Sequence, residues 1–259
     1  MRVISFKWKN FEPIIVFDDG RKLPLFDQYL HFKLGKRYCI GYYKNGKRHP
    51  CPENNEVRHG YQCELCKRLD ENLPCVQCVG ICRNPKRRPK CMKETYYLYL
   101  AVFGSMLKVG ISIEHRIRQR LVEQGADFGV RLFTITDGAL ARIEEQKIRK
   151  YLNIVDRVNG NEKHRHLNGN DDESINIIKK AIELLKKKYN FSPTICDLRH
   201  YYRIKDIKTK FINLDEGTVI KGKVISVKGN LIVLENNNIS FNVHQLIGRE
   251  IIPLNNSPI

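Results

Sequence analysis

The sequence predicts an α+β protein built of several modules, and three observations support this prediction. A cysteine-rich segment at residues 39–93 lacks long periodic stretches, so something other than a hydrophobic core must hold it together. Residues 94–190 alternate apolar, strand-like runs with amphipathic helical periods. Residues 215–252 contain short apolar runs separated by Gly or Asn turns, a pattern typical of a small β barrel.

Three domains are expected along the chain. Residues 1–93 combine N-terminal strands (ISFKW and IIVF, with turn signals such as DDG) with the cysteine-rich module. Residues 94–190 are expected to form an α/β domain, and residues 191–259 a small C-terminal β domain. The polar stretch RVNGNEKHRHLNGNDD, at about residues 157–172, is predicted to be a loop.

The central domain has the clearest local signals. YYLYLAVFG and LKVGI predict two strands joined by a tight turn at Gly104 and Ser105. HRIRQRLVEQ, GALARIEEQKIRKYL and ESINIIKKAIELLKKKY predict three helices. In the last of these, five apolar side chains share one face opposite a face of lysines: Ile175, Ile178, Ile182, Leu185 and Tyr189.

Charge and hydropathy indicate the kind of partner. The formal net charge is +18 and the pI is about 9.5, which favours a polyanion such as nucleic acid; a solvated lysine-rich surface is the alternative. Residues 1–93 are the most basic part, with 20 Lys and Arg against 9 Asp and Glu. The sequence has no apolar run of about 18 residues and no apolar core of a signal peptide near its first residues. A cytoplasmic protein with no membrane partner is therefore expected.

Eight cysteines in the N-terminal third predict structural zinc. Cys63-Glu-Leu-Cys66 and Cys75-Val-Gln-Cys78 are two C-x2-C motifs, each of which directs two sulfurs at one ion from about 2.3 Å. Disulfides are the alternative, but they need an oxidising compartment. Eight thiolates complete two closed four-cysteine sites, which leave no position open for catalysis.

The pairing of these ligands stays open at the level of sequence. A sequential arrangement uses Cys39, Cys51, Cys63 and Cys66 for one site and Cys75, Cys78, Cys82 and Cys91 for the other. The spacing allows an interleaved arrangement equally well. An iron–sulfur cluster is a weaker alternative, because its ligand spacings usually differ.

A basic run lies among these cysteines, in RNPKRRPKC. Its two prolines predict an extended chain that follows a phosphate backbone, with five basic side chains as candidate nucleic-acid contacts: Arg83, Lys86, Arg87, Arg88 and Lys90.

The segment KVGISIEHRIRQR places three more arginines after a predicted strand end: Arg116, Arg118 and Arg120. On a helix over about 113–124, Arg120 lies about 60° from the centre of the buried stripe. The other two, further candidate nucleic-acid contacts, lie about 100° away. On the next helix, with Leu140 and Ile143 taken as part of the buried face, Glu144 falls near the middle of the apolar arc and Glu145 just outside it. A carboxylate on an apolar face must be paired or bind a metal.

A set of these side chains has chemical meaning. Tyr97 and Tyr99 share one face of the first strand because strand side chains alternate. A phenol and Lys108 would activate water, an arginine would neutralise phosphate, and Glu144 would hold one divalent ion.

The run YYLYLAVFGSMLKVGI, followed by a helical arginine and a later helical glutamate, resembles the GIY-YIG nuclease superfamily over about residues 95–152. The resemblance implies a one-metal phosphodiesterase site with Mg²⁺ or Mn²⁺ at Glu144. Lys108 takes the place of the second motif tyrosine, and Tyr97 or Tyr99 that of the first. Spacing after Gly110, the glycine of the second motif, favours Arg118 as the arginine that neutralises phosphate. Helical phase favours Arg120 instead, and we select Arg120.

Nearly the whole chain also resembles a largely archaeal family of unknown function. This resemblance rests on YCIGYY and HPCP, then LYLAVFGSMLKVGIS, RLVEQGA at 120–126 and GKVISVKGNLIVL. Two functional hypotheses follow, both with nucleic acid as partner and RNA favoured over DNA. One is a metal-dependent nuclease, and the other is a non-catalytic RNA- or ribosome-associated factor. A nucleic-acid modification enzyme lacks support, because no nucleotide-binding glycine loop occurs.

Overall fold

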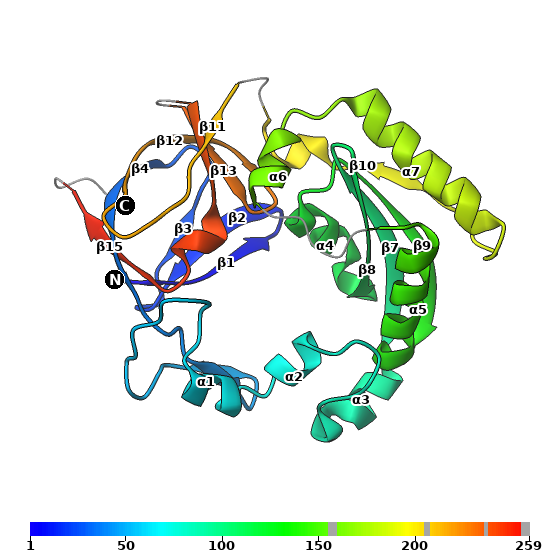
Figure 1. The fold of residues 1–259 in the computed structure, drawn as a ribbon, viewed down its shortest axis with the longest axis horizontal. Coiled ribbons are helices and arrows are strands. Elements are labelled where there is room, and N and C mark those ends of the chain that lie inside the picture. The colour runs from blue at the N-terminus through cyan, green and yellow to red at the C-terminus, as the bar shows by residue number, and fades with distance from the viewer. Residues whose placement is uncertain (155–159, 205–207, 236–237, 255–259) are drawn as a thin grey trace. The chain divides into compact units, whose positions relative to one another are not determined.

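The computed structural model describes residues 1–154, 160–204, 208–235 and 238–254. Within these residues the chain forms four β-sheets and several helices, which confirms the α+β class (Figure 1). The residues divide into two units. The first unit joins Met1–Val76 to Ile207–Ile259, and the second unit is Gln77–Asp206.

The largest sheet of the first unit has the strand order β11-β14-β13-β12-β4-β15. Its strands, in chain order, are β4 (Tyr29–Arg37), β11 (Lys210–Phe211), β12 (Val219–Lys228), β13 (Leu231–Leu234), β14 (Ile239–Asn242) and β15 (Arg249–Pro253). Strand β4 lies between β12 and β15 and is antiparallel to both. The N-terminal and C-terminal segments therefore share one sheet.

This pairing differs from the domain organisation predicted at 1–93, 94–190 and 191–259. The strands of the C-terminal segment complete a sheet with β4 instead of forming a module of their own. The sheet begins at β11 and ends at β15, so the described strands close no barrel. The alternation that predicted the strands is local, whereas the partner of β12 lies almost 200 residues away.

The remainder of the first unit carries a three-stranded sheet and the cysteine-rich segment. The elements are β1 (Val3–Lys9), β2 (Glu12–Phe17), β3 (Lys22–Pro24), the hairpin β5 (Tyr42–Lys44) and β6 (Lys47–His49), α1 (Glu64–Leu69), α2 (Leu73–Val76) and the 3-10 turn Val243–Leu246. Trp8 of β1 is buried and donates a hydrogen bond from Nε1 to the Gly229 carbonyl oxygen, 2.9 Å away. This bond links β1 to the turn between β12 and β13.

The second unit is built on an antiparallel sheet with the order β10-β9-β7-β8. Its strands are β7 (Thr95–Phe103), β8 (Met106–Ile113), β9 (Phe128–Thr136) and β10 (Ile195–Asp197). Its helices are α3 (Arg88–Lys93), α4 (Ile117–Gln124), α5 (Gly138–Tyr151), α6 (Gly160–Arg165) and α7 (Asp171–Lys186), with 3-10 turns at Pro85–Arg87, Glu114–Arg116 and Arg199–Tyr201.

Local sequence explains the elements that were predicted here. The β7–β8 hairpin confirms the predicted strand pair and its turn at Gly104 and Ser105. Helix α7 begins where the Asn170 side chain accepts hydrogen bonds from two backbone N–H groups, and three acidic residues follow in its first turn. Its apolar face, with Ile178, Ile182 and Leu185 buried, packs into the core beneath β7 and β9.

Two features of the second unit differ from the sequence analysis. No element was predicted for β9, although it forms seven residue pairs with β7 at the centre of the sheet. The predicted loop at about 157–172 contains α6 and the start of α7, while residues 155–159 lie outside the described part of the chain.

Candidate functional site

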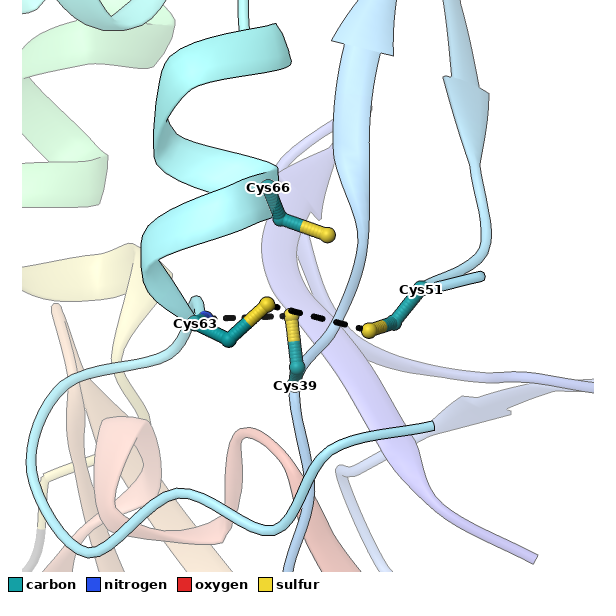
Figure 2. A group of neighbouring side chains, drawn as sticks. All are labelled: Cys39, Cys51, Cys63 and Cys66. Carbon is teal, nitrogen blue, oxygen red and sulfur yellow. Dashed lines mark hydrogen bonds between the residues drawn. The ribbon is translucent and has the colours of Figure 1, made fainter. Parts of the chain in front are cut away.

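Four cysteines of the first unit converge on one point (Figure 2). Cys39 follows β4, Cys51 follows the β5–β6 hairpin, Cys63 caps α1 and Cys66 lies inside α1. The C-x2-C motif works here because the helix begins at its first cysteine, which turns both sulfurs toward the same side. The four sulfur atoms all lie within 4.8 Å of one another.

This geometry fits a zinc ion. Sulfurs about 2.3 Å from zinc at tetrahedral angles are about 3.8 Å apart, and Cys51 Sγ lies 3.8 Å from Cys63 Sγ. The backbone N–H groups of Gly41 and Cys63 donate hydrogen bonds to Cys39 Sγ, at 3.4 and 3.2 Å. All the cysteines are free thiols, so the disulfide alternative is not realised. The structure thus selects the sequential set for the first site.

Burial favours the protonated form of these thiols, and protonation competes with metal binding. Burial raises the pKa of Cys39 and of Cys66. Burial also acts to raise the pKa of Cys63, but hydrogen bonds from Cys66 N–H, Asn55 and Cys39 outweigh it and lower the pKa to about 7. A buried set of protonated thiols is stable without charge, whereas four thiolates need a cation between them.

The other four cysteines do not form a comparable group. Cys75 belongs to the first unit, and the other three belong to the second. Cys78 Sγ donates to the Ile81 carbonyl oxygen at 3.6 Å, and Cys82, which is exposed, donates to the Asn84 carbonyl oxygen at 3.4 Å. Cys91 packs against Gly138 at the start of α5. In the part of the chain that the structure describes, only the first set meets the geometry of a metal site.

The basic run is helical from Pro85 onward, which corrects the prediction of an extended chain. Pro85 and Pro89 stand in the first turns of the 3-10 helix Pro85–Arg87 and of α3, where proline is well tolerated. Arg88 forms a bidentate ion pair with Asp137, including a 2.6 Å bond from Nη2 to Oδ2, and Lys90 Nζ lies 3.7 Å from Glu94. Arg88 therefore fastens α3 to the start of α5. Arg83, Lys86 and Arg87 lie in the same segment, with Lys86 and Arg87 exposed.

A second candidate site lies on the sheet of the second unit, around Tyr99. Tyr99 is 1% exposed and pairs with Gly110 of β8. Its phenol lies across Gly110, where a Cβ atom would be 2.4 Å from the phenol oxygen. Glycine at this position therefore makes room for the ring. The guanidinium of Arg120, on α4, acts on the same phenol and lowers its pKa.

The three arginines after β8 occupy different places. Ile117 and Leu121 are buried, which confirms the predicted phase of the helix. Arg120 lies at the edge of the core and contacts Tyr99 and Glu123, whereas Arg116 and Arg118 are exposed. Arg116 pairs with Glu123 at 2.9 Å, and the Arg118 guanidinium lies 5.7 Å from the centre of the Tyr201 ring.

Lys108 and Glu145 complete the cluster. Lys108 lies opposite Ala101, which follows Tyr99 by two residues in β7. Its ammonium donates a hydrogen bond to Gln124 Oε1, 2.7 Å away. Much of the Lys108 side chain is exposed, but surrounding atoms desolvate its ammonium and thereby lower its pKa. The charge of Arg120 lowers this pKa further, whereas the charge of Glu145 raises it. Burial raises the pKa of Tyr99, while the charge and hydrogen bond of Arg120 lower it.

The carboxylate of this cluster is Glu145, which the sequence analysis placed outside the site. Glu145 acts electrostatically on both Tyr99 and Lys108, and its Oε2 accepts a 2.7 Å hydrogen bond from Arg142. Glu144 instead accepts from Tyr189 at 2.6 Å and from Lys147 at 2.9 Å. Burial acts to raise the pKa of Glu144, but these two hydrogen bonds outweigh it and lower the pKa.

The sequence pattern indicated the wrong buried face for α5. Leu140 and Ile143 were taken as its buried face, but they are 53% and 40% exposed. The buried residues are Gly138, Ala139, Ala141 and Ile148. A Cβ at Gly138 would lie 2.9 Å from Tyr96, so α5 approaches the strands closely at its small residues. Small residues carry little hydrophobic weight in a sequence pattern, although they permit the closest packing.

Tyr97, on the same face as Tyr99, lies outside the cluster. Its hydroxyl donates to Glu114 at 3.3 Å, and the Arg131 guanidinium lies 5.4 Å from the centre of its ring. Of the two candidate tyrosines, Tyr99 is thus the one that packs against Gly110 and interacts with Arg120.

Comparison with known proteins identifies a family for this chain. A family model described as a protein of unknown function (DUF2797) matches residues 29–251. No curated protein and no solved structure matches the chain. Among the described residues, no helix is long and apolar enough to cross a membrane.

Proposed function

The chain belongs to the DUF2797 family of proteins of unknown function, and we propose that it binds nucleic acid, RNA in preference to DNA, and cleaves phosphodiester bonds at the Tyr99 cluster. One observation carries the proposal: a buried phenol packs across Gly110, and an arginine and a carboxylate act electrostatically on both this phenol and Lys108, the four side chains coming from four separate elements. This arrangement agrees with the resemblance to GIY-YIG nucleases. The net charge of +18 supports a polyanionic substrate.

The pKa directions suggest distinct roles for the two candidate bases. The pKa of Lys108 is lowered by burial and by Arg120, which increases its fraction as a neutral amine. The pKa of Tyr99 is raised by burial, so its phenol keeps its proton and acts as a donor. In this proposal Lys108 accepts the proton of the attacking water, and Arg120 offsets charge that develops on the phosphate.

The residues present fit a weakly held Mg²⁺ or Mn²⁺. The four cysteines are the only group of three or more metal-ligating side chains in the described residues, so Glu145 would bind this ion as a single carboxylate. Mg²⁺ commonly binds through one or two carboxylates with substrate phosphate and water as its other ligands. When bound, the ion would stabilise negative charge on the phosphate. Its affinity is therefore expected to depend on the substrate.

The zinc site has a structural role in this proposal. Four thiolates close the coordination sphere and leave no position for substrate. We assign one zinc ion to Cys39, Cys51, Cys63 and Cys66. Nine cysteines that form no disulfide suit a reducing compartment, which supports a cytoplasmic location.

A non-catalytic binding factor is the second candidate, and a specific observation favours it. Arg120 and Arg116 both donate to Glu123, and Lys108 donates to Gln124. The cations that would face a phosphate therefore already have partners. A binder with this arrangement would retain nucleic acid through surface lysines and arginines without needing Glu145 or a divalent ion.

Cleavage assays separate the two candidates. Zinc-loaded protein is incubated with end-labelled cellular RNA and with branched DNA, with Mg²⁺ or Mn²⁺ added or omitted. The nuclease predicts products that appear only with the added ion, at a rate that rises with pH as Lys108 loses its proton. Tight retention of the RNA without cleavage under every condition would instead identify the binding factor.

A further inference from the structure

A groove runs along α5 on a side that the candidate site does not use. It has a volume of about 590 Å³ and lies between the helix and the segment around Val79. Gln146 Nε2 donates to the Val79 carbonyl oxygen at 3.4 Å. Gly80 packs against Ile143, since a Cβ at Gly80 would lie 2.5 Å from Ile143 Cγ1. These contacts define one wall of the groove.

The groove is positively charged. Its charged lining residues are Lys147, Arg149 and Lys150, and no carboxylate lines it in the described part of the chain. Lys147 pairs with Glu144, which is not itself among the lining residues. Val79, Ile143 and Ile154 add apolar surface between the cations. Cations arranged along a partly apolar groove suit a phosphate backbone whose sugars and bases contact the apolar atoms.

Helical geometry places the groove next to the face of α5 that carries Glu145. At about 100° per residue from Gly138, Glu145 falls at about 340° and Arg149 at about 20°. Gln146 and Lys150 of the groove follow at about 80° and 120°. Arg149, which lines the groove, therefore lies one helical turn after Glu145, on a neighbouring face of α5.

We propose that this groove binds the phosphodiester backbone of a single nucleic-acid strand that extends from the Tyr99 site. The inference rests on the proposed function and adds the path of the substrate. A groove of this volume suits a ligand of drug size, comparable with one or two nucleotides, and so a single strand rather than a duplex. Arg149 and Lys150 are the principal phosphate contacts.

The test compares two double variants of the full, zinc-loaded chain without added Mg²⁺ or Mn²⁺. Arg149→Gln/Lys150→Gln alters the groove, and Lys179→Gln/Lys180→Gln removes the same charge from exposed positions of α7. Binding of a labelled single-stranded RNA, and of DNA of the same sequence, is measured by fluorescence anisotropy between about 50 and 200 mM salt, the range in which phosphate contacts dominate affinity.

The groove variant is expected to lower the slope of log affinity against log salt by about 1.4, because each phosphate contact to a single strand contributes about 0.7. The α7 variant should change the slope by less than half as much. RNA and DNA arms identify which backbone is preferred. Equal changes in the two variants, or no binding of either strand, would overturn the proposal. So would binding of poly-glutamate in place of nucleic acid with the same dependence on the groove.

This result is separable from the proposed function. If the slope falls as expected but no cleavage occurs with any divalent ion, the groove stands and the nuclease hypothesis fails. If cleavage requires Glu145 but the groove variant binds like the wild type, the substrate follows another path and the inference on the groove fails.

Discussion

Loss of zinc from the first unit is expected to unfold the segment that contains Cys39 to Cys66. The purified protein should contain one zinc ion per chain, and Cys66→Ser should release it. Cys66 is fully buried and its sulfur belongs to the four-thiol group. Because a site of this kind contributes its binding free energy directly to folding, the expected loss of stability is several kcal/mol. Zinc analysis and thermal unfolding of the two proteins measure both effects.

Cys82→Ser is the matched control for this experiment. Cys82 was predicted as a zinc ligand but is exposed, and its thiol donates a hydrogen bond to the Asn84 carbonyl oxygen. The variant should keep one zinc ion and its unfolding temperature. A ratio of two zinc ions per chain, with one lost in Cys82→Ser, would instead establish the second site that the sequence suggested.

Replacement of Arg120 by Gln is expected to reduce cleavage by about 100- to 1,000-fold. Arg120 is the guanidinium that acts on the Tyr99 phenol, and a donor aimed at developing charge is worth a factor of this size. The substitution also removes the interaction of Arg120 with Lys108, which lowers the lysine pKa. The pKa of Lys108 should therefore rise, and the rising limb of the pH–rate profile should move to higher pH.

Arg118→Gln provides the comparison, because it removes the same charge two residues away. Arg118 is exposed, near the Tyr201 ring. This variant should cleave at close to the wild-type rate, with weaker binding at most. The opposite ranking of the two variants would assign the phosphate-neutralising role to Arg118, as the spacing after the motif glycine suggested.

Local patterns predicted the elements whose partners are near in sequence. The β7–β8 hairpin follows from two apolar runs around Gly104, and α7 from a cap at Asn170 and a long apolar stripe. The four-cysteine group is a similar case, since Cys63 and Cys66 share one helical turn and the chain needs only to bring two more sulfurs to them. In each, the informative residues are chemically distinctive.

Other features depended on packing that no local pattern records. Strand β4 pairs with β12 and β15, which belong to the far end of the chain, so a sequence divided into consecutive blocks separates them. Glu145 was missed because Gly138 and Ala141, not Leu140, face the sheet. The one signal available was that Ala141, Glu145, Ile148 and Leu152 follow a helical repeat.

Cleavage by Glu145→Gln and Glu144→Gln, side by side with the wild type, tests the account most directly. Both substitutions remove one carboxylate from adjacent positions of α5, but only Glu145 acts on Tyr99 and Lys108. The account predicts that Glu145→Gln binds the labelled RNA normally and fails to cleave it with Mg²⁺ or Mn²⁺, while Glu144→Gln still cleaves. Cleavage that survives in Glu145→Gln, or is lost only in Glu144→Gln, would contradict it.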